Sequence, residues 1–198
     1  MAASHDSDPA PPDFEIAASL AEFTMPAAKW LTRNATKLQE ANLKLNGLAT
    51  GVVVFNPAGK VLLVQRASHD SMPDRWEIPG GAVDDDDTTI VHGAARELRE
   101  EAGLVARRFG PPVTGFGDGT DLHVFPNRNA TRWFCRFVFI ADVVDCEAVR
   151  LDPNEHQDFV WAREDEVRGQ RVGGRDIPIT HETMRAIILK AFRLREQA

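Results

Sequence analysis

The sequence predicts one α/β domain in which helices pack against a sheet. The chain has 198 residues, of which 43% are hydrophobic, and this is enough to bury one sizeable core. Short apolar runs bounded by turn residues alternate with segments of helical periodicity, as expected for layered strands and helices. The clearest strand signal is residues 131–144, rich in aromatic and β-branched residues, and the clearest helix signal is residues 89–102.

The N-terminal part divides into two segments. Residues 1–12 are small, polar and proline-containing, which predicts a disordered tail. Residues 13–47 are interpreted as an N-terminal extension, in which residues 14–23 have room for a short edge strand. Pro26 suits a first helical turn, and the helix formers that follow it predict a helix over residues 27–45. The main domain is assigned to residues 48–198.

The first strands of the main domain are predicted from apolar runs and turn residues. Residues 48–55 and 60–65 are separated by Asn-Pro-Ala-Gly, and this pattern predicts a β-hairpin. Residues 76–79 are expected to be extended, because the residue before a proline avoids the helical region. The Gly80-Gly81 pair that follows predicts a turn.

The helix over residues 89–102 has identifiable ends. Asp87 or Thr88 can cap its start, and Gly103 can end it. One side is apolar and is expected to pack on the sheet; this stripe comprises Val91, Ala94, Ala95, Leu98 and Ala102.

The remaining elements follow the same logic. The predictions are a strand within 104–116 that Pro111-Pro112 interrupts, a loop over 117–128, the strand 131–144, a short strand 159–161 and an amphipathic helix 179–196.

The bulk composition excludes several classes of protein. A net charge of −7 argues against a binder of nucleic-acid polymers, which would carry a basic surface. No segment has the apolar length of a membrane span, and the N-terminus lacks a signal-peptide pattern. Two cysteines are too few for a disulfide framework, and Cys135 is interpreted as a core residue. We therefore expect a reduced, cytoplasmic protein.

The polar side of the 89–102 helix carries the chemistry. Glu97, Glu100 and Glu101 have i, i+3 and i+4 spacing and are expected to converge on one face. Oxygen-rich clusters suit hard cations such as Mg²⁺ or Mn²⁺, and a cation beside a glycine loop is typical of phosphate chemistry. Taken alone, the same pattern also fits a solvated, salt-bridged helix face.

The spacing from the glycine pair resembles the Nudix box, the signature of Nudix hydrolases. The second half of the box matches at Arg96, Glu97, Leu98, Glu100, Glu101, Gly103 and Leu104. In the first half, the loop after Gly81 is one residue longer than the family pattern. The first acidic position of the box therefore falls on Asp87 when counted from Gly81, and on Thr88 when counted back from Arg96. The resemblance extends over roughly residues 48–195.

The resemblance implies an α/β/α sandwich with a mixed sheet. It also implies Mg²⁺-dependent hydrolysis, with Mn²⁺ as the other candidate ion, of a phosphoanhydride in a nucleoside diphosphate linked to another moiety. The implied metal ligands are the carboxylates of Glu97, Glu100 and Glu101 and the carbonyl of Gly81. Arg96 is expected to support the site by orienting a carboxylate, either Glu100 or Asp87.

Further site residues are predicted outside the box. In similar Nudix proteins the region around residues 155–156 lies near the substrate, so the resemblance makes Glu155 a candidate general base or extra metal ligand, and His156 a candidate phosphate contact. Arg66 and Gly80 are predicted to contact substrate. The alternative interpretation is that residues 155–156 form a surface turn and that the arginine only makes the surface more soluble.

Two other features are interpreted as structural. The acidic run 84–87 is expected to be a solvated loop whose charges complement the helix dipole, with Asp87 its one candidate for a role in the site. Trp76 and Trp133 are expected to be core aromatics.

Two other functions compete with the hydrolase. A catalytically silent Nudix-like module that binds nucleotides is the alternative, and the longer loop favours it; an ordinary acidic interaction domain would require the match to be coincidence. The candidate substrates are nucleoside diphosphate derivatives, damaged nucleoside triphosphates, dinucleoside polyphosphates and diphosphoinositol polyphosphates, the last disfavoured by the low basic content. A homodimer through the 27–45 helix is compatible with the sequence.

Overall fold

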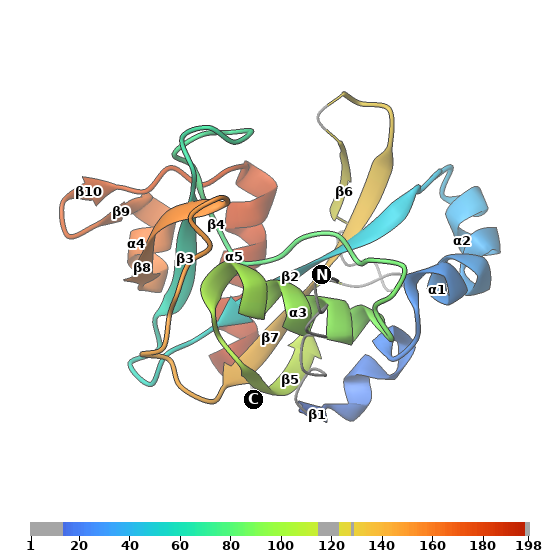
Figure 1. The fold of residues 1–198 in the computed structure, drawn as a ribbon, viewed down its shortest axis with the longest axis horizontal. Coiled ribbons are helices and arrows are strands. Elements are labelled where there is room, and N and C mark those ends of the chain that lie inside the picture. The colour runs from blue at the N-terminus through green and yellow to red at the C-terminus, as the bar shows by residue number, and fades with distance from the viewer. Residues whose placement is uncertain (1–13, 115–122, 128, 197–198) are drawn as a thin grey trace, which may run out of the picture.

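In the described part of the chain, two main β-sheets lie between layers of helix (Figure 1), and a separate two-stranded antiparallel sheet is formed by β9 (Arg171–Val172) and β10 (Arg175–Asp176). The computed structural model describes residues 14–114, 123–127 and 129–196. Helix α3 (Ile90–Ala102) packs on one side of the sheets and helix α5 (Glu182–Glu196) on the other, because their apolar faces belong to two separate core clusters. The predicted α/β/α sandwich is therefore confirmed.

The larger sheet is mixed. Its strands lie in the order β1-β5-β7-β2, and β6 also pairs with β7. The pairs β1/β5 and β2/β7 are parallel, whereas β7 is antiparallel to both β5 and β6. The strands are β1 (Glu15–Ile16), β2 (Gly47–Val54), β5 (Ala106–Pro112), β6 (His123–Pro126) and β7 (Trp133–Val143). The short edge strand predicted within 14–23 is confirmed as β1, and a 3-10 helix, η1 (Ala18–Phe23), follows it.

The smaller sheet is antiparallel, with the order β4-β3-β8. It comprises β3 (Val61–Arg66), β4 (Trp76–Glu77) and β8 (His156–Ala162). The predicted hairpin of β2 and β3 is wrong, since the two strands belong to different sheets and meet at an isolated bridge between Phe55 and Val61. Each strand instead pairs along its length with a distant partner: β2 with β7, and β3 with β8.

The predicted 27–45 helix is also wrong in its extent. It divides into α1 (Ala27–Arg33) and α2 (Ala35–Glu40) at Asn34, and residues after Glu40 leave the helix. The Asn34 side-chain amide donates to the Trp30 carbonyl, the kind of local bond with which asparagine competes against regular helix. Trp30 and Leu38 are buried in the core of the same chain, so these two residues are not free to form a dimer contact.

Smaller differences concern ends and connections. The predicted loop 117–128 contains strand β6, and its residues 117–122 and 128 lie outside the described residues. Helix α5 begins at Glu182 rather than at Ile179, because Ile179 forms a bridge with Trp76. The sequence did not predict α4 (Glu164–Gly169), β9 (Arg171–Val172) or β10 (Arg175–Asp176).

Strand β7 shows how the core is divided. Its residues Cys135, Phe137 and Phe139 face the α3 side, where η1 and α1 also pack, while Val138 faces α5. Cys135 is thus a core residue, as predicted. Trp76 is fully buried as predicted, whereas Trp133 is 45% exposed, so its assignment to the core is wrong.

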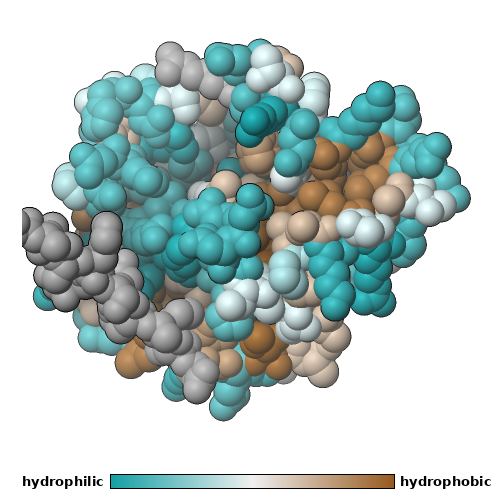
Figure 2. Space-filling model, turned by 45° about the vertical axis from the view of Figure 1, so that its right-hand side comes forward, coloured by the Kyte–Doolittle hydropathy of each residue, from teal (hydrophilic) through white to brown (hydrophobic). Residues whose placement is uncertain are grey.

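The surface is mostly hydrophilic in the view of Figure 2, with apolar residues gathered in a recess on the right. Among the described residues, no helix combines the length and apolar character that crossing a membrane requires.

Candidate active site

The glycine pair runs alongside β2 as extended backbone, so the predicted turn is wrong. The amide of Thr50 donates to the Gly81 carbonyl at 2.8 Å, and the amide of Val52 donates to the Pro79 carbonyl at 2.8 Å. Gly80 has φ 149°, and a Cβ there would lie 2.3 Å from the Thr50 carbonyl oxygen. Only glycine therefore allows this close approach to β2.

Helix α3 directs two buried glutamates at this glycine strand. Glu101 is 6% exposed and accepts a hydrogen bond from the Gly80 amide at 2.6 Å. Glu97, 9% exposed, lies so close to Gly81 that a Cβ on the glycine would be 2.6 Å from its Oε2. The helix begins after Thr89, whose side chain accepts from the His92 amide, and ends at the left-handed Gly103. The predicted end is confirmed, while the capping residue is Thr89 rather than Asp87 or Thr88.

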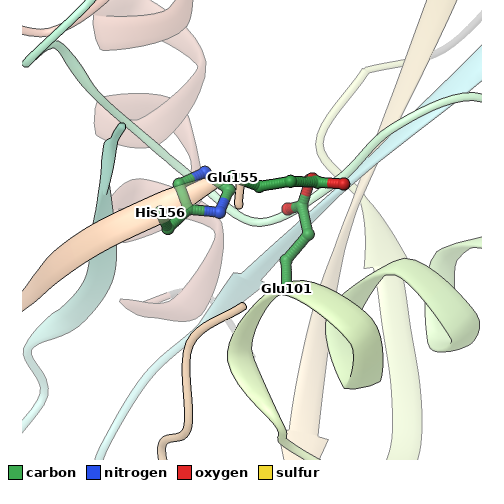
Figure 3. Close-up of side chains that lie close together, drawn as sticks. All are labelled: Glu101, Glu155 and His156. Carbon is green, nitrogen blue, oxygen red and sulfur yellow. The ribbon is translucent and has the colours of Figure 1, made fainter. Parts of the chain in front are cut away.

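A loop before β8 brings a third carboxylate to the same place. Ligand atoms of Glu101, Glu155 and His156 all lie within 4.8 Å of one another. Figure 3 shows the carboxylates of Glu101 and Glu155 next to each other, one from α3 and one from the loop before β8. Glu155 is exposed, whereas His156 is 2% exposed, so the surface-turn interpretation fails for His156.

The electrostatics of the glutamates suit a cation. Burial, with the charges of Glu100 and Glu155, raises the pKa of Glu97 to about 7, although Arg96 opposes the shift. Burial raises the pKa of Glu101 well above its ordinary value, and Glu155, Glu97 and Glu77 add to the shift. Clustered buried carboxylates that resist ionisation are the environment that a bound divalent cation would stabilise. The oxygen donors therefore fit a hard cation.

Arg96 fixes the acidic loop to the helix. Its guanidinium donates to both carboxylate oxygens of Asp87, at 3.1 and 3.0 Å, and to the Ala82 carbonyl at 2.9 Å. It also donates to Glu97 and Glu100, each at 2.9 Å. Both contacts expected of Arg96, with Glu100 and with Asp87, are present. Glu100 itself is 57% exposed in its side chain, so it lies at the rim of the cluster.

An ionic network of buried and half-buried side chains adjoins the cluster. Arg66 pairs with Glu77 and Asp70, and the Nε2 atom of His156 lies 3.6 Å from Glu77 Oε1. Burial alone would raise the pKa of Glu77, but His156, Arg66 and Arg136 together hold it below its ordinary value. Glu77 is therefore an ionised, paired carboxylate. It is a site residue that the sequence did not reveal, because a single glutamate in a short strand has no distinctive spacing.

A cavity of about 610 Å³ opens in front of these groups. Its lining includes five of the predicted site residues, namely Arg66, Gly80, Gly81, Glu101 and Glu155. Glu97, Glu100, Arg96 and His156 are not part of this lining; they lie behind it or at its rim. The lining also contains residues that the sequence analysis missed, namely His123, Phe125, Phe134, Arg136, Thr180 and His181. For His123 and Phe125 on β6, and for Phe134 and Arg136 on β7, the alternation along the strand was the available signal.

Comparison with known proteins agrees with this architecture. A family model for the NUDIX domain matches residues 45–182. The MutT protein from Methanosarcina mazei Go1 is 20% identical and superposes with a TM-score of 0.59, covering 78% of this chain and 98% of its own.

Two other solved structures share the fold. The NUDIX domain of Shewanella oneidensis NrtR, complexed with ADP ribose, is 20% identical with a TM-score of 0.57, covering 83% of this chain and 97% of its own. A C. elegans Ap4A hydrolase is 21% identical with a TM-score of 0.56, covering 77% of this chain and 99% of its own. With the family match over most of its length, the chain belongs to the Nudix family.

Proposed function

We propose that this chain is a Mg²⁺-dependent hydrolase, with Mn²⁺ as an alternative ion, that cleaves a phosphoanhydride bond in a nucleoside diphosphate linked to another moiety. The observation that supports this most strongly is the meeting of the Glu101 and Glu155 carboxylates at the cavity wall. The similarity to proteins that bind ADP ribose or hydrolyse Ap4A suggests that both compounds are worth testing as substrates.

The divalent ion would be held by α3 and the glycine strand. We assign Glu97, Glu100 and Glu101 as its carboxylate ligands and the Gly81 carbonyl as a further one. When bound, the ion would neutralise phosphate charge and lower the pKa of a bound water. Glu101 is anchored by the Gly80 amide, and Glu97 and Glu100 by Arg96, so the protein presents their oxygens in fixed positions.

Glu155 is assigned as the general base. It is exposed at the cavity and adjacent to Glu101, so it can accept a proton from an attacking water. Its loop is held by the Glu155 carbonyl, which accepts from the Ala67 amide at 2.8 Å. Glu155 thus approaches the substrate from the loop before β8, while the proposed carboxylate ligands approach from α3.

We assign Arg66 and Gly80 to substrate contacts, and His156 to a supporting role at the site. Arg66 lines the cavity. Its guanidinium donates hydrogen bonds to Glu77, Asp70 and Ser71, and these bonds fix its position. Gly80 presents backbone at the cavity wall. His156 is buried against Glu77, so we propose that it contributes through this contact and through its position beside Glu155.

The test is a substrate panel with Mg²⁺, read out by the mass of the products. It includes ADP ribose, Ap4A, damaged nucleoside triphosphates and a diphosphoinositol polyphosphate. Cleavage of at least one nucleoside diphosphate derivative, abolished by chelating the ion, is the expected result. Binding of nucleotides without turnover would identify the silent module instead. A cytoplasmic location and a homodimer stay predictions.

A further inference from the structure

We propose that the cavity wall formed by β6 and β7 binds the nucleobase of the substrate, with the phosphates lying toward the glutamates. This inference rests on the proposed function and identifies the part of the substrate that this wall would bind. We name the wall the ring-binding face; it comprises His123, Phe125, Phe134 and Arg136.

Strand register brings these four side chains to one face. His123 pairs with Arg136 and Phe125 with Phe134 across the antiparallel β6/β7 ladder. Residues two apart on a strand point to the same side, so both pairs face the cavity that they line. The rings of Phe125 and Phe134 are near-parallel, with an interplanar angle of 27° and centroids 6.0 Å apart. The Arg136 guanidinium lies 4.8 Å from the Phe125 ring centroid.

Strand β2 has small residues beside the ring-binding face. Gly47 is the register partner of Phe134, and Ala49 is the partner of Arg136. A Cβ on Gly47 would lie 2.9 Å from the Phe134 ring, so the glycine gives this ring its space. Ala49 lines the cavity beside the arginine. Small residues at both positions leave room above the sheet for a flat ligand.

The cavity also offers buried polar atoms that need partners. Nδ1 of His123, Oγ1 of Thr180 and Nε of Arg136 have no hydrogen-bond partner among the described residues. His123 is 7% exposed and Thr180 is 8% exposed, and both line the cavity. Leaving such groups unpaired costs free energy. A nucleobase carries ring nitrogens and exocyclic groups that can pair with them, whereas an aliphatic chain would not.

The order along the sheet matches the order within a nucleoside diphosphate. The Thr50–Gly81 hydrogen bond places the glycine strand opposite the centre of β2, next to the glutamates. Arg136 is register-paired with Ala49, one position further along β2, and Phe134 is two positions beyond Arg136 on β7. The phosphates would thus lie next to the cation held by the carboxylates. Arg136 would come next along the sheet, and the nucleobase would lie against Phe125 and Phe134.

The experiment measures binding of two matched probes by calorimetry in the presence of Mg²⁺. One is adenosine 5′-(α,β-methylene)diphosphate, which carries the base, and the other is methylenediphosphonate, which lacks it. Phe134→Leu and Phe125→Leu remove a ring while keeping an apolar side chain. Phe159→Leu is the matched control, because Phe159 is 38% exposed on β8 and does not line the cavity.

The expected result is a roughly 5- to 150-fold rise in the Kd of the nucleotide probe in either cavity variant, the range that base–aromatic stacking contributes. The Kd of methylenediphosphonate should stay unchanged, and Phe159→Leu should alter neither. Phe134→Tyr, which restores a ring, should bind the nucleotide as the wild type does. This rescue separates stacking from damage to the fold.

Equal loss of both probes, or no loss of either, would overturn the inference. So would tight binding of dimethylallyl diphosphate, an aliphatic diphosphate, with the same sensitivity to the leucine variants. Failure of the proposed function would look different, since the wild type would then cleave nothing in the substrate panel. An unchanged KM for nucleotide hydrolysis in both leucine variants would reject the ring-binding face while leaving hydrolysis intact.

Discussion

Two acidic regions of the molecule differ in how far their negative charges are compensated by neighbouring groups. The loop 84–87 is the denser run of carboxylates, yet its innermost member, Asp87, is held by Arg96 and by the Asp84 amide. The cluster of Glu97, Glu101 and Glu155 is spread over two elements, and two of its members are buried and have raised pKa values.

The difference lies in which charges are already compensated. A guanidinium and a backbone amide satisfy Asp87, so this carboxylate gains little from a cation. At Glu101, one backbone amide opposes the combined effects of burial and neighbouring carboxylates. We therefore propose the cation site at the buried, uncompensated carboxylates rather than at the denser acidic run.

The largest effect is expected from Glu101→Gln. Removing a carboxylate from the cluster should lower kcat about 10³-fold, since the proposed ion supplies several kcal/mol of charge stabilisation in the transition state. The amide oxygen can still accept from the Gly80 amide, and repulsion within the cluster is relieved, so the unfolding midpoint should not fall. Steady-state kinetics and urea denaturation check both parts. Wild-type turnover would remove Glu101 from the ion site.

Asp87→Asn should act on stability more than on chemistry. The substitution breaks a two-pronged contact between Arg96 and a side chain that is 7% exposed, so the free energy of unfolding should fall by about 2 kcal/mol. Because Arg96 also orients Glu97, activity should fall by about tenfold. Urea denaturation with parallel rate measurements tests this. A change in activity as large as that of Glu101→Gln would mean that Asp87 binds the ion.

His123 should make stability depend on pH. Burial, together with the charges of Arg136 and His181, lowers its pKa in the fold to about 4. Between that value and about 6.5, the unfolded chain takes up a proton that the folded chain does not, so the contribution of His123 to stability falls as the pH is lowered from 7 to 5. The raised pKa of Glu97 contributes in the opposite direction over this range. The loss due to His123 should amount to about 1–2 kcal/mol and should be absent in His123→Gln. Urea titrations at both pH values provide the comparison, and an identical loss in both proteins would contradict it.

Asp85→Asn should have the smallest effect. Asp85 is exposed in the acidic loop, and the proposed ion site does not include it. Surface changes of this kind usually alter stability by less than about 0.5 kcal/mol. Activity, metal affinity and unfolding midpoint should all match the wild type. A clear drop in Mn²⁺ affinity would move the cation site toward the loop.

The elements that the sequence predicted well are those specified by local signals. Helix α3 has an apolar stripe and a glycine at its end, and both appear in the structure. Strand pairing was harder: the partner of β2 is β7, far along the chain, and the turn residues between β2 and β3 carry no information about it. The broken 27–45 helix shows the same limit, because one asparagine side chain decides where α1 ends.

The candidate site divides along similar lines. Glu97, Glu101 and Arg96 share a helix, and their spacing was sufficient to predict that they lie close together. His123 and Arg136 lie on paired strands, so only register brings them to one face. Glu77 on β4 and His156 on β8 come into contact because both strands pair with β3. No spacing within the sequence predicts that contact.

The most direct test of the difference between the two acidic regions is a calorimetric titration with Mn²⁺. It compares the wild type, Glu101→Gln, and the double variant Asp85→Asn/Asp86→Asn. The account predicts binding in the wild type and the loop variant with equal Kd, and at least tenfold weaker binding in Glu101→Gln. Weakened binding in the loop variant, with wild-type affinity in Glu101→Gln, would contradict it.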